Sequence, residues 1–188
     1  TLRTLAHTDP LTSLPNRRLM FERLNEVARR CDAEGRQAAL VFVDLDGFKP
    51  MNDLFGHGFG DAVLCEVAHR LLSAARQGDT VARLGGDEFV VLLADIGGPA
   101  VAQQVALRAV AALQAPMQLG RREVRLTASM GIALYPADGE ATKLLAAADA
   151  AMYEAKRGGG GQVVFFAAHM EADARAQMEL QRDLRLAM

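Results

Sequence analysis

A glycine pair followed by two acids, set between apolar segments, constrains this chain more than any other feature. The stretch Gly-Gly-Asp-Glu-Phe occupies residues 85–89, and the apolar segments 81–84 and 89–93 flank the acids. Apolar segments of strand length around a Gly-Asp pair predict a β-hairpin with Gly-Asp at its tip. Glycines leave the backbone open to close approach, and two carboxylates at a rigid tip suit a metal ion beside a phosphate chain.

Length and composition bound the class of protein. The 188 residues, 51% of them hydrophobic, are enough for one domain with a core. The sequence has no apolar run long enough to cross a membrane and no signal peptide, and Cys31 and Cys65 are isolated. We expect a soluble cytoplasmic domain. This is compatible with a parent protein that carries a membrane anchor outside this segment. The net charge of −2 argues against binding to nucleic acid.

The hydrophobic pattern predicts a regular order of elements. A helix capped by Asn16 is expected to run to about Glu34. Further helices are expected at 47–55, 61–76, 99–115 and 142–157, and strands at 38–43, within 81–93, at 124–135 and at 163–166. After the first helix the order is β-α-α-β-β-α-β-α-β, which predicts an α/β (α+β) fold of the split βαβ kind: a mixed sheet with flanking helices.

Carboxylates follow the predicted strand at 38–43. Asp44 and Asp46 are two residues apart, so they share one face of the strand at the edge of the sheet. Either residue could instead cap the helix expected from Gly47 and bind nothing. Together with Asp87 from the hairpin, however, Asp44 would offer Mg²⁺ oxygen ligands from two neighbouring elements. Backbone donors at the start of the helix, around Phe48 and Lys49, could receive a phosphate.

A second polar group lies between residues 52 and 61. An amide and a carboxylate, Asn52 and Asp61, can together read the edge of guanine, because the carboxylate accepts from its N–H groups. The alternative is that both residues only terminate and cap helices. His57, which follows Gly56, is a candidate for lining the site and is otherwise an ordinary loop residue.

Several motifs in the same order resemble the GGDEF family of diguanylate cyclases. They are Asp-Pro-Leu-Thr-Ser-Leu-Pro-Asn-Arg-Arg at 9–18, Asp-Leu-Asp-Gly-Phe-Lys at 44–49, the pairs at 52–53, 56–57 and 60–61, the stretch 85–89, and Ala-Asp-Ala-Ala-Met-Tyr-Glu-Ala-Lys at 148–156. The resemblance covers about residues 5–166. It implies a mostly antiparallel sheet like the palm of nucleotide cyclases. It also implies condensation of two GTP into cyclic di-GMP with Mg²⁺ or Mn²⁺.

The resemblance also implies roles for individual residues. The metal ligands would be Asp44, Asp87 and the carbonyl of Leu45, and the base for the ribose 3′-hydroxyl would be Asp87 or Glu88. Guanine would be held by Asn52 and Asp61. Contacts to the rest of the substrate would come from Phe48, Lys49, Lys156, Gly85 and Gly86, with Lys49 also stabilising charge during transfer. The alternative for Lys156 is a solvated lysine at the end of a helix.

Two features concern assembly and control. Because each domain would hold one GTP while the product is a two-fold ring, we expect an active homodimer with isologous contacts. Arg76 and Asp79 match the position of the family's inhibitory site, where cyclic di-GMP binds and blocks the approach of the two domains. On residues alone, the pair would be an ordinary surface ion pair.

The glycines 159–161 depart from the family pattern, which has Gly-Arg-Asn there. Loss of that arginine, a triphosphate contact, would cost about 1.5–3 kcal/mol of binding or transition-state stabilisation. Arg157 is nearby and could substitute for it.

The two ends of the chain predict a longer parent protein. Residues 1–8 resemble the end of a signalling helix, 9–166 the GGDEF domain, and 167–188 a linker helix toward an EAL phosphodiesterase domain. A sensor–GGDEF–EAL parent leaves a rival hypothesis: a weakly active or inactive GTP-binding domain that regulates the phosphodiesterase. A receptor for cyclic di-GMP that acts through Arg76 and Asp79 is a third.

Overall fold

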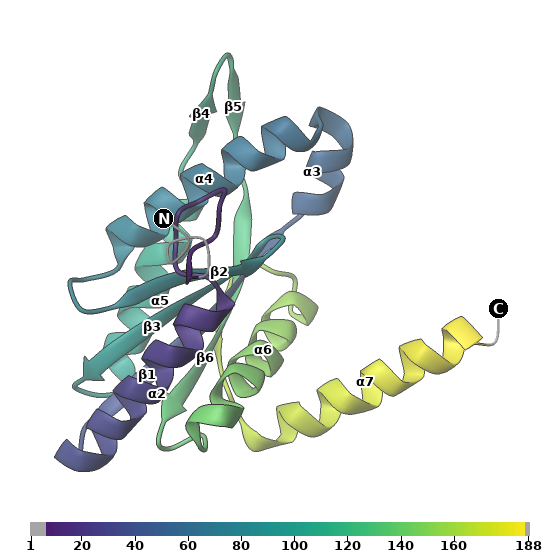
Figure 1. The fold of residues 1–188 in the computed structure, drawn as a ribbon. Coiled ribbons are helices and arrows are strands. Elements are labelled where there is room, and N and C mark those ends of the chain that lie inside the picture. Colours follow the sequence, from purple (N-terminus) through teal and green to yellow (C-terminus); the bar gives the residue numbers. More distant parts are fainter. Residues whose placement is uncertain (1–6, 187–188) are drawn as a thin grey trace.

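The computed structural model describes residues 7–186, which form a five-stranded sheet covered by helices on both faces (Figure 1). The helices are α2 (Arg17–Glu34), α3 (Phe48–Phe55), α4 (His57–Ala74), α5 (Pro99–Gln114), α6 (Ala141–Arg157) and α7 (Ala168–Leu186). The strands are β1 (Gln37–Asp46), β2 (Thr80–Gly85), β3 (Glu88–Ile96), β4 (Met117–Leu119), β5 (Arg122–Val124), β6 (Thr127–Tyr135) and β7 (Val163–Phe165).

The sheet has the strand order β2-β3-β1-β6-β7. The central strand β1 pairs antiparallel with β3 and β6, and only β7 runs parallel to its neighbour β6. This confirms the predicted mixed, mostly antiparallel sheet. The apolar run at 38–43 forms the middle of the sheet because its residues are buried on both faces.

Alternate residues of β1 pack into two different core layers. Val41, Val43 and Leu45 pack with α4 and α5, whereas Leu40 and Phe42 pack with α2 and α6. Asp44 has the same parity as Phe42, so it faces the layer of α2 and α6. Any chemistry at Asp44 therefore involves the ends of these two helices.

The helix α6 lies unusually close to strand β6. A methyl group added at Gly131 would fall 2.0 Å from the carbonyl oxygen of Ala148 and 2.2 Å from the amide nitrogen of Met152. Only a residue without a side chain permits this approach, so Gly131 sets the distance between α6 and the sheet.

Three predicted boundaries were wrong. β1 continues past Asp44 to Asp46, because its residues pair with 127–129 of β6. The helix expected from Asp61 begins at His57, since Gly56, with a φ of 90°, ends α3 and starts α4 without an intervening loop. The strand expected at 124–135 is two strands, because the short hairpin β4–β5 precedes β6. Its two strands have three residues each, which is too short for an alternating pattern to stand out.

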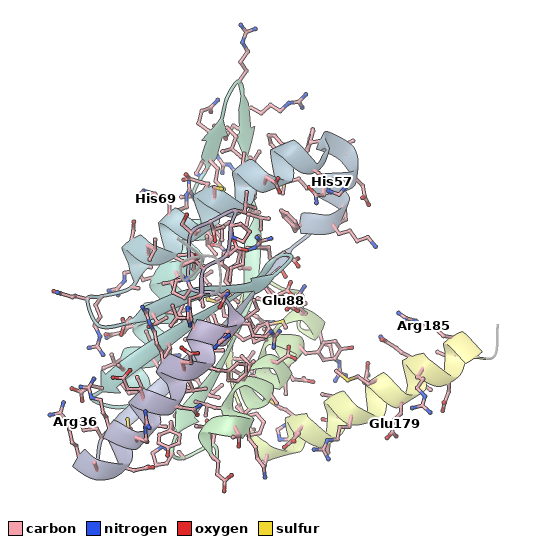
Figure 2. The ribbon with its side chains drawn as sticks, in the orientation of Figure 1. Arg36, His57, His69, Glu88, Glu179 and Arg185 are labelled. Carbon is pink, nitrogen blue, oxygen red and sulfur yellow. The ribbon has the colours of Figure 1, made fainter. Side chains whose placement is uncertain are left out.

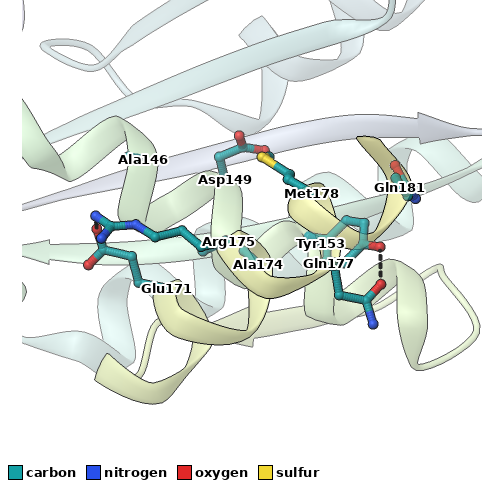
Figure 3. A pocket seen from close by; sticks show the side chains of 10 residues that line it. Ala146, Asp149, Tyr153, Glu171, Ala174, Arg175, Gln177, Met178 and Gln181 are labelled. Carbon is teal, nitrogen blue, oxygen red and sulfur yellow. Dashed lines mark hydrogen bonds and ion pairs between the residues drawn. The ribbon is translucent and has the colours of Figure 1, made fainter. Parts of the chain in front are cut away.

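The C-terminal helix α7 contacts α6 and encloses a hollow of about 310 Å³ against it (Figure 3). The hydroxyl of Tyr153 donates a hydrogen bond of 3.0 Å to Gln177 across this contact. The far part of α7 leaves the domain, and its apolar residue Leu184 is exposed. None of the helices within 7–186 is long and apolar enough to span a membrane.

Candidate active site

The hairpin tip has the predicted form. Gly85 pairs with Glu88, which leaves Gly86 and Asp87 as the two-residue turn. Gly86 has a φ of 49° and Gly85 a φ of 144°, values that residues other than glycine rarely adopt. The glycines thus turn the chain tightly and bring Asp87 and Glu88 to the edge of the sheet, where Figure 2 shows Glu88.

A buried ion pair holds this tip in place. The guanidinium of Arg83 donates to the carbonyl of Gly86 at 2.8 and 3.0 Å and to both carboxylate oxygens of Asp9 at 3.0 and 3.1 Å. Asp9 also accepts from the amide and hydroxyl of Thr12 at 2.8 and 2.7 Å. Burial works against the charge, but the Thr12 and Arg83 hydrogen bonds hold the pKa of Asp9 below its ordinary value of 3.8. Sequence reasoning missed this role of Asp9 and Arg83.

Asp44 lies directly across from the tip. In the pairing of β1 with β3, Asp44 stands opposite Glu88, and the amide of Leu45 donates a long hydrogen bond of 3.4 Å to the carbonyl of Asp87. The structure therefore brings together Asp44, Leu45, Asp87 and Glu88, which the sequence placed in two distant segments.

The carboxyl of Asp44 is the most perturbed group of the site. Its residue is only 9% exposed, and burial, with the Asp87 and Glu88 carboxylates, raises its pKa to about 6. The ammonium of Lys156 opposes this shift from 2.5 Å away. Although that ion pair is close, Oδ1 of Asp44 has no hydrogen-bond partner of normal geometry among the described residues. Such an atom is ready to accept a further cation.

A fourth carboxyl, Asp149 of α6, lies in the same electrostatic field. Burial and the charge of Asp44 raise the pKa of Asp149, and burial with Asp149 and Asp87 raises that of Glu88. Asp149 and Glu88 line a hollow of about 340 Å³ together with Arg17 of α2. Sequence reasoning did not assign Asp149 a place in the site. The available signal was its position seven residues before Lys156, which puts both on one face of α6.

These residues fit a divalent metal of the magnesium type. Within the described residues, no three His, Cys, Asp or Glu side chains gather closely enough to form a cage by themselves. Mg²⁺ is ordinarily held by one or two carboxylates together with substrate phosphates. The pair Asp44 and Asp87, with the buried Oδ1 of Asp44 held only by the ammonium of Lys156 among the described residues, matches that requirement.

The neighbouring Asp46 is occupied by the fold. It accepts hydrogen bonds from Thr127 and Ser129, each of 2.8 Å, and from the amide of Gly161, of 2.9 Å. It neither caps α3 nor remains available as a ligand, and instead ties the glycine loop after α6 to the sheet.

The candidate guanine residues lie on α3 and α4. Asn52 is packed against Gly60, where an added methyl group would fall 1.8 Å from its Oδ1. That oxygen is buried without a hydrogen-bond partner in the described chain, and the amide nitrogen lies 3.4 Å from Nδ1 of His57. Asp61 is exposed one turn into α4. Neither side chain therefore caps a helix, which was the alternative to a role in binding.

The start of α3 supplies the candidate phosphate contacts. Gly47 caps the helix and offers no side-chain hydrogen bond to its first amides. Phe48 is buried in the core, and Lys49 is exposed beside it. The backbone amides there are thus open to a ligand, and Phe48 serves as an anchor for the helix.

The pair Arg76 and Asp79 is well ordered by its surroundings. The side chain of Asp79 is 1% exposed and accepts from the backbone amide and guanidinium of Arg76 at 3.0 and 3.4 Å. Arg76 also donates to the carbonyls of Ala94 and Asp95 at 2.6 and 3.1 Å. Its guanidinium, with 45% of the side chain exposed, presents its remaining edge to the outside.

The loop after α6 has glycines at 159–161, where the family pattern has Gly-Arg-Asn. Gly160 has a φ of 76°, and an added methyl group would fall 2.9 Å from Oδ2 of Asp46. Arg157 does not reach toward the site, because its guanidinium pairs with Glu154 at 2.9 Å, one turn back on α6. In this conformation Arg157 is thus paired within α6, and its substitution for the family arginine stays a prediction.

Comparison with known proteins agrees with this site. The family model described as "Diguanylate cyclase, GGDEF domain" matches residues 6–162. The chain therefore belongs to the GGDEF family. It is 47% identical to MucR of Pseudomonas aeruginosa, a bifunctional diguanylate cyclase/cyclic di-GMP phosphodiesterase, over 98% of this chain and 27% of MucR. It is 38% identical to the cyclic di-GMP phosphodiesterase PdeR of Escherichia coli, over all of this chain and 28% of PdeR.

Solved structures show the same fold. The GGDEF domain of TpbB from Pseudomonas aeruginosa matches with a TM-score of 0.86 and 41% identity, over 90% of this chain and 99% of that one. The GGDEF domain of DgcB from Caulobacter crescentus, in complex with cyclic di-GMP, matches with a TM-score of 0.80 and 29% identity, over 85% and 95%. This chain spans only about a quarter of the length of the two curated relatives, 27% and 28%.

Proposed function

We propose that this domain is a diguanylate cyclase, which condenses two GTP into cyclic di-GMP and releases pyrophosphate. The observation that carries the proposal is the union of Asp44, Asp87 and Glu88 at one sheet edge, with Asp44 buried beside a single cation. Carboxyl groups buried among other acids, with a raised pKa like that of Asp44, cluster at functional sites. Membership of the family and the cyclase names of its relatives support the same activity.

The metal would be Mg²⁺ or Mn²⁺, held by Asp44, Asp87 and the carbonyl of Leu45. When bound, it would neutralise charge on the phosphates and polarise the phosphorus that is attacked. The first-turn amides of α3 and Lys49 would orient the phosphate chain, and Asn52 and Asp61 would fix guanine, with His57 lining the site. Gly85 and Gly86 keep the tip free of side chains where the substrate passes.

In the reaction, the 3′-oxygen of each GTP attacks the α-phosphorus of the other. The new phosphodiester bond forms as the bond to pyrophosphate breaks, and Glu88 or Asp87 accepts the proton of the 3′-hydroxyl. Because one domain offers one set of these residues, two domains must face each other, and a homodimer with isologous contacts supplies this arrangement. Cyclic di-GMP at Arg76 and Asp79 would then oppose the approach of the domains.

Asp87→Asn tests the assignment directly. The variant keeps the shape of the turn but loses the charge, so cyclic di-GMP formation from GTP and Mg²⁺ should fall by about 100-fold or more. The melting temperature without nucleotide should stay near that of the wild type. Near-wild-type turnover by a folded Asp87→Asn domain would rule out its metal role.

A second candidate function is a GTP-binding domain that regulates an attached phosphodiesterase. Two observations favour it: Gly160 stands where the family has an arginine, and Arg157 is paired with Glu154. The helix α7 would then be the connector to that second domain, and residues 1–8, of which 1–6 lie outside the described chain, the end of a signalling helix. Tight GTP binding by a verified dimer without product would support this function.

A further inference from the structure

Lysine is rare in this chain, and one lysine has an unusual position. The three lysines are Lys49, Lys143 and Lys156, against eighteen arginines. Lys49 and Lys143 are exposed. Lys156, in the last turn of α6, instead directs its ammonium to Oδ1 of Asp44 at 2.5 Å. In residues 7–186 this is the one ion pair that involves a proposed metal ligand.

The surroundings of Asp44 require a positive charge. The side chain of Asp44 is 12% exposed, and three further acids, Asp87, Glu88 and Asp149, share its electrostatic field. A buried carboxylate without a counter-ion is strongly unfavourable. The nearest cation, Lys156, is itself 36% exposed, so its route to solvent is open.

The chemistry of lysine makes this contact exchangeable. An ammonium on a flexible four-carbon stem acts as a compact point charge that moves without breaking a fixed fork of hydrogen bonds. Within residues 7–186 the structure shows a single such contact, from the ammonium to Oδ1 of Asp44 at 2.5 Å, and the lysine side chain is 36% exposed. Lys156 thus compensates the charge of Asp44 without locking it.

We propose that Lys156 is a counter-ion that holds the place of the metal: it neutralises Asp44 while no metal is bound and is released when Asp44 takes a cation. The inference rests on the proposed metal role of Asp44. Once released, the ammonium is free to pair with an anionic group of the nucleotide. A phosphate group that pairs with Lys156 draws it away from Asp44 and so strengthens metal binding. In the same way, a metal that displaces Lys156 strengthens phosphate binding, so the two ligands bind with positive coupling.

The first test measures Mn²⁺ binding without nucleotide, by electron paramagnetic resonance of the free ion. Lys156→Met removes the competitor, so Mn²⁺ should bind on the order of tenfold more tightly than to the wild type. Lys143→Met, on the same helix but exposed and away from the site, should bind like the wild type. Asp44→Asn should lose the site.

The outcomes separate two failures. If Asp44→Asn binds Mn²⁺ as well as the wild type, the proposed metal site is wrong. If Asp44→Asn loses binding but Lys156→Met and the wild type have equal affinity, the metal site stands and the counter-ion role of Lys156 is wrong.

The second test uses only the wild-type domain, so it does not depend on the folding of a variant. With nitrogen-15 lysine, the wild-type domain has only three side-chain ammonium signals to resolve. The chemical shift of Lys156, which is held in its ion pair, should change as Mg²⁺ is added, and the midpoint of this change should equal that of Mg²⁺ binding. The chemical shift of Lys143 should stay constant. A Lys156 signal that is unchanged at saturating Mg²⁺ would overturn the proposal.

Discussion

At the scale of single residues, the site is a balance between buried acids and few cations. Asp44 and Glu88 face each other across two strands, and Asp149 adds a third carboxyl from the helix above. Burial is the main reason that the pKa values of all three are raised, because it penalises the charged form. This arrangement is electrostatically unfavourable for the protein alone, and the proposed metal and nucleotide would relieve it.

The Asp9–Arg83 pair predicts a pH-dependent contribution to stability. Because the folded-state pKa of Asp9 lies below 3.8, its charge stabilises the fold fully above pH 3.8, and this contribution is lost as the pH falls through the folded-state value. Asp9→Asn should lower the free energy of unfolding by about 1–3 kcal/mol at pH 7. Urea titrations of both proteins should show the difference narrowing below pH 3.8. An equal difference at pH 7 and pH 3 would contradict the role of the charge.

Arg76 predicts relief of product inhibition. Its guanidinium is oriented by Asp79 and by two carbonyls of β3, so its free edge is prepared to meet a phosphate or a guanine. In Arg76→Ala, the inhibition constant of cyclic di-GMP should rise about tenfold or more, since charge-assisted contacts are lost. The rate at low product should change little. Superimposable inhibition curves for the two proteins would refute the assignment.

At the scale of elements, the contact of α6 with β6 positions half of the site. α6 carries both Lys156 and Asp149, and its height above the sheet depends on Gly131. β1 and β3 carry the other half, and their register fixes Asp44 opposite Glu88. Small shifts of α6 should thus change the charge balance at Asp44, because they move Lys156 and Asp149 relative to it.

Gly131→Ala tests this arrangement. The added methyl group meets backbone atoms of α6 within about 2 Å, so the helix must move and packing is lost. We expect a loss of about 1–3 kcal/mol in the free energy of unfolding and a lower rate of cyclic di-GMP formation. Gly97→Ala, where the added group meets nothing within 4 Å, is the matched control. A Gly131→Ala domain as stable and active as this control would show that the contact is not limiting.

Much of this arrangement is readable from sequence, and the rest depends on long-range geometry. The Gly-Asp turn and the apolar run at 38–43 carry strong local signals, so the hairpin and β1 were predicted. The hairpin β4–β5 was missed because its strands have only three residues each, too few to give a periodic pattern. The three hydrogen bonds that Asp46 accepts could not be predicted, since they depend on the pairing of β1 with β6 and on how the loop after α6 folds back.

At the scale of the whole molecule, the proposed reaction needs two copies of the domain. Residues 7–186 supply one proposed metal pair, one candidate base and one candidate guanine pair, whereas the proposed product joins two nucleotides. For the proposed reaction a second domain would approach over the hairpin tip, and α7, which packs on α6, extends away from that tip (Figure 1). Association of domains is then the step that a partner domain or a product molecule can control.

The central claim is that the domain is a diguanylate cyclase, and the formation of cyclic di-GMP by a covalently linked dimer tests it most directly. Two copies joined by a flexible linker, saturated with GTP and Mg²⁺, should form cyclic di-GMP at a rate per domain that does not depend on protein concentration. The unlinked domain should show a rate per domain that rises with concentration. If the linked dimer binds GTP and forms no cyclic di-GMP, the domain is not a cyclase and its function is regulatory.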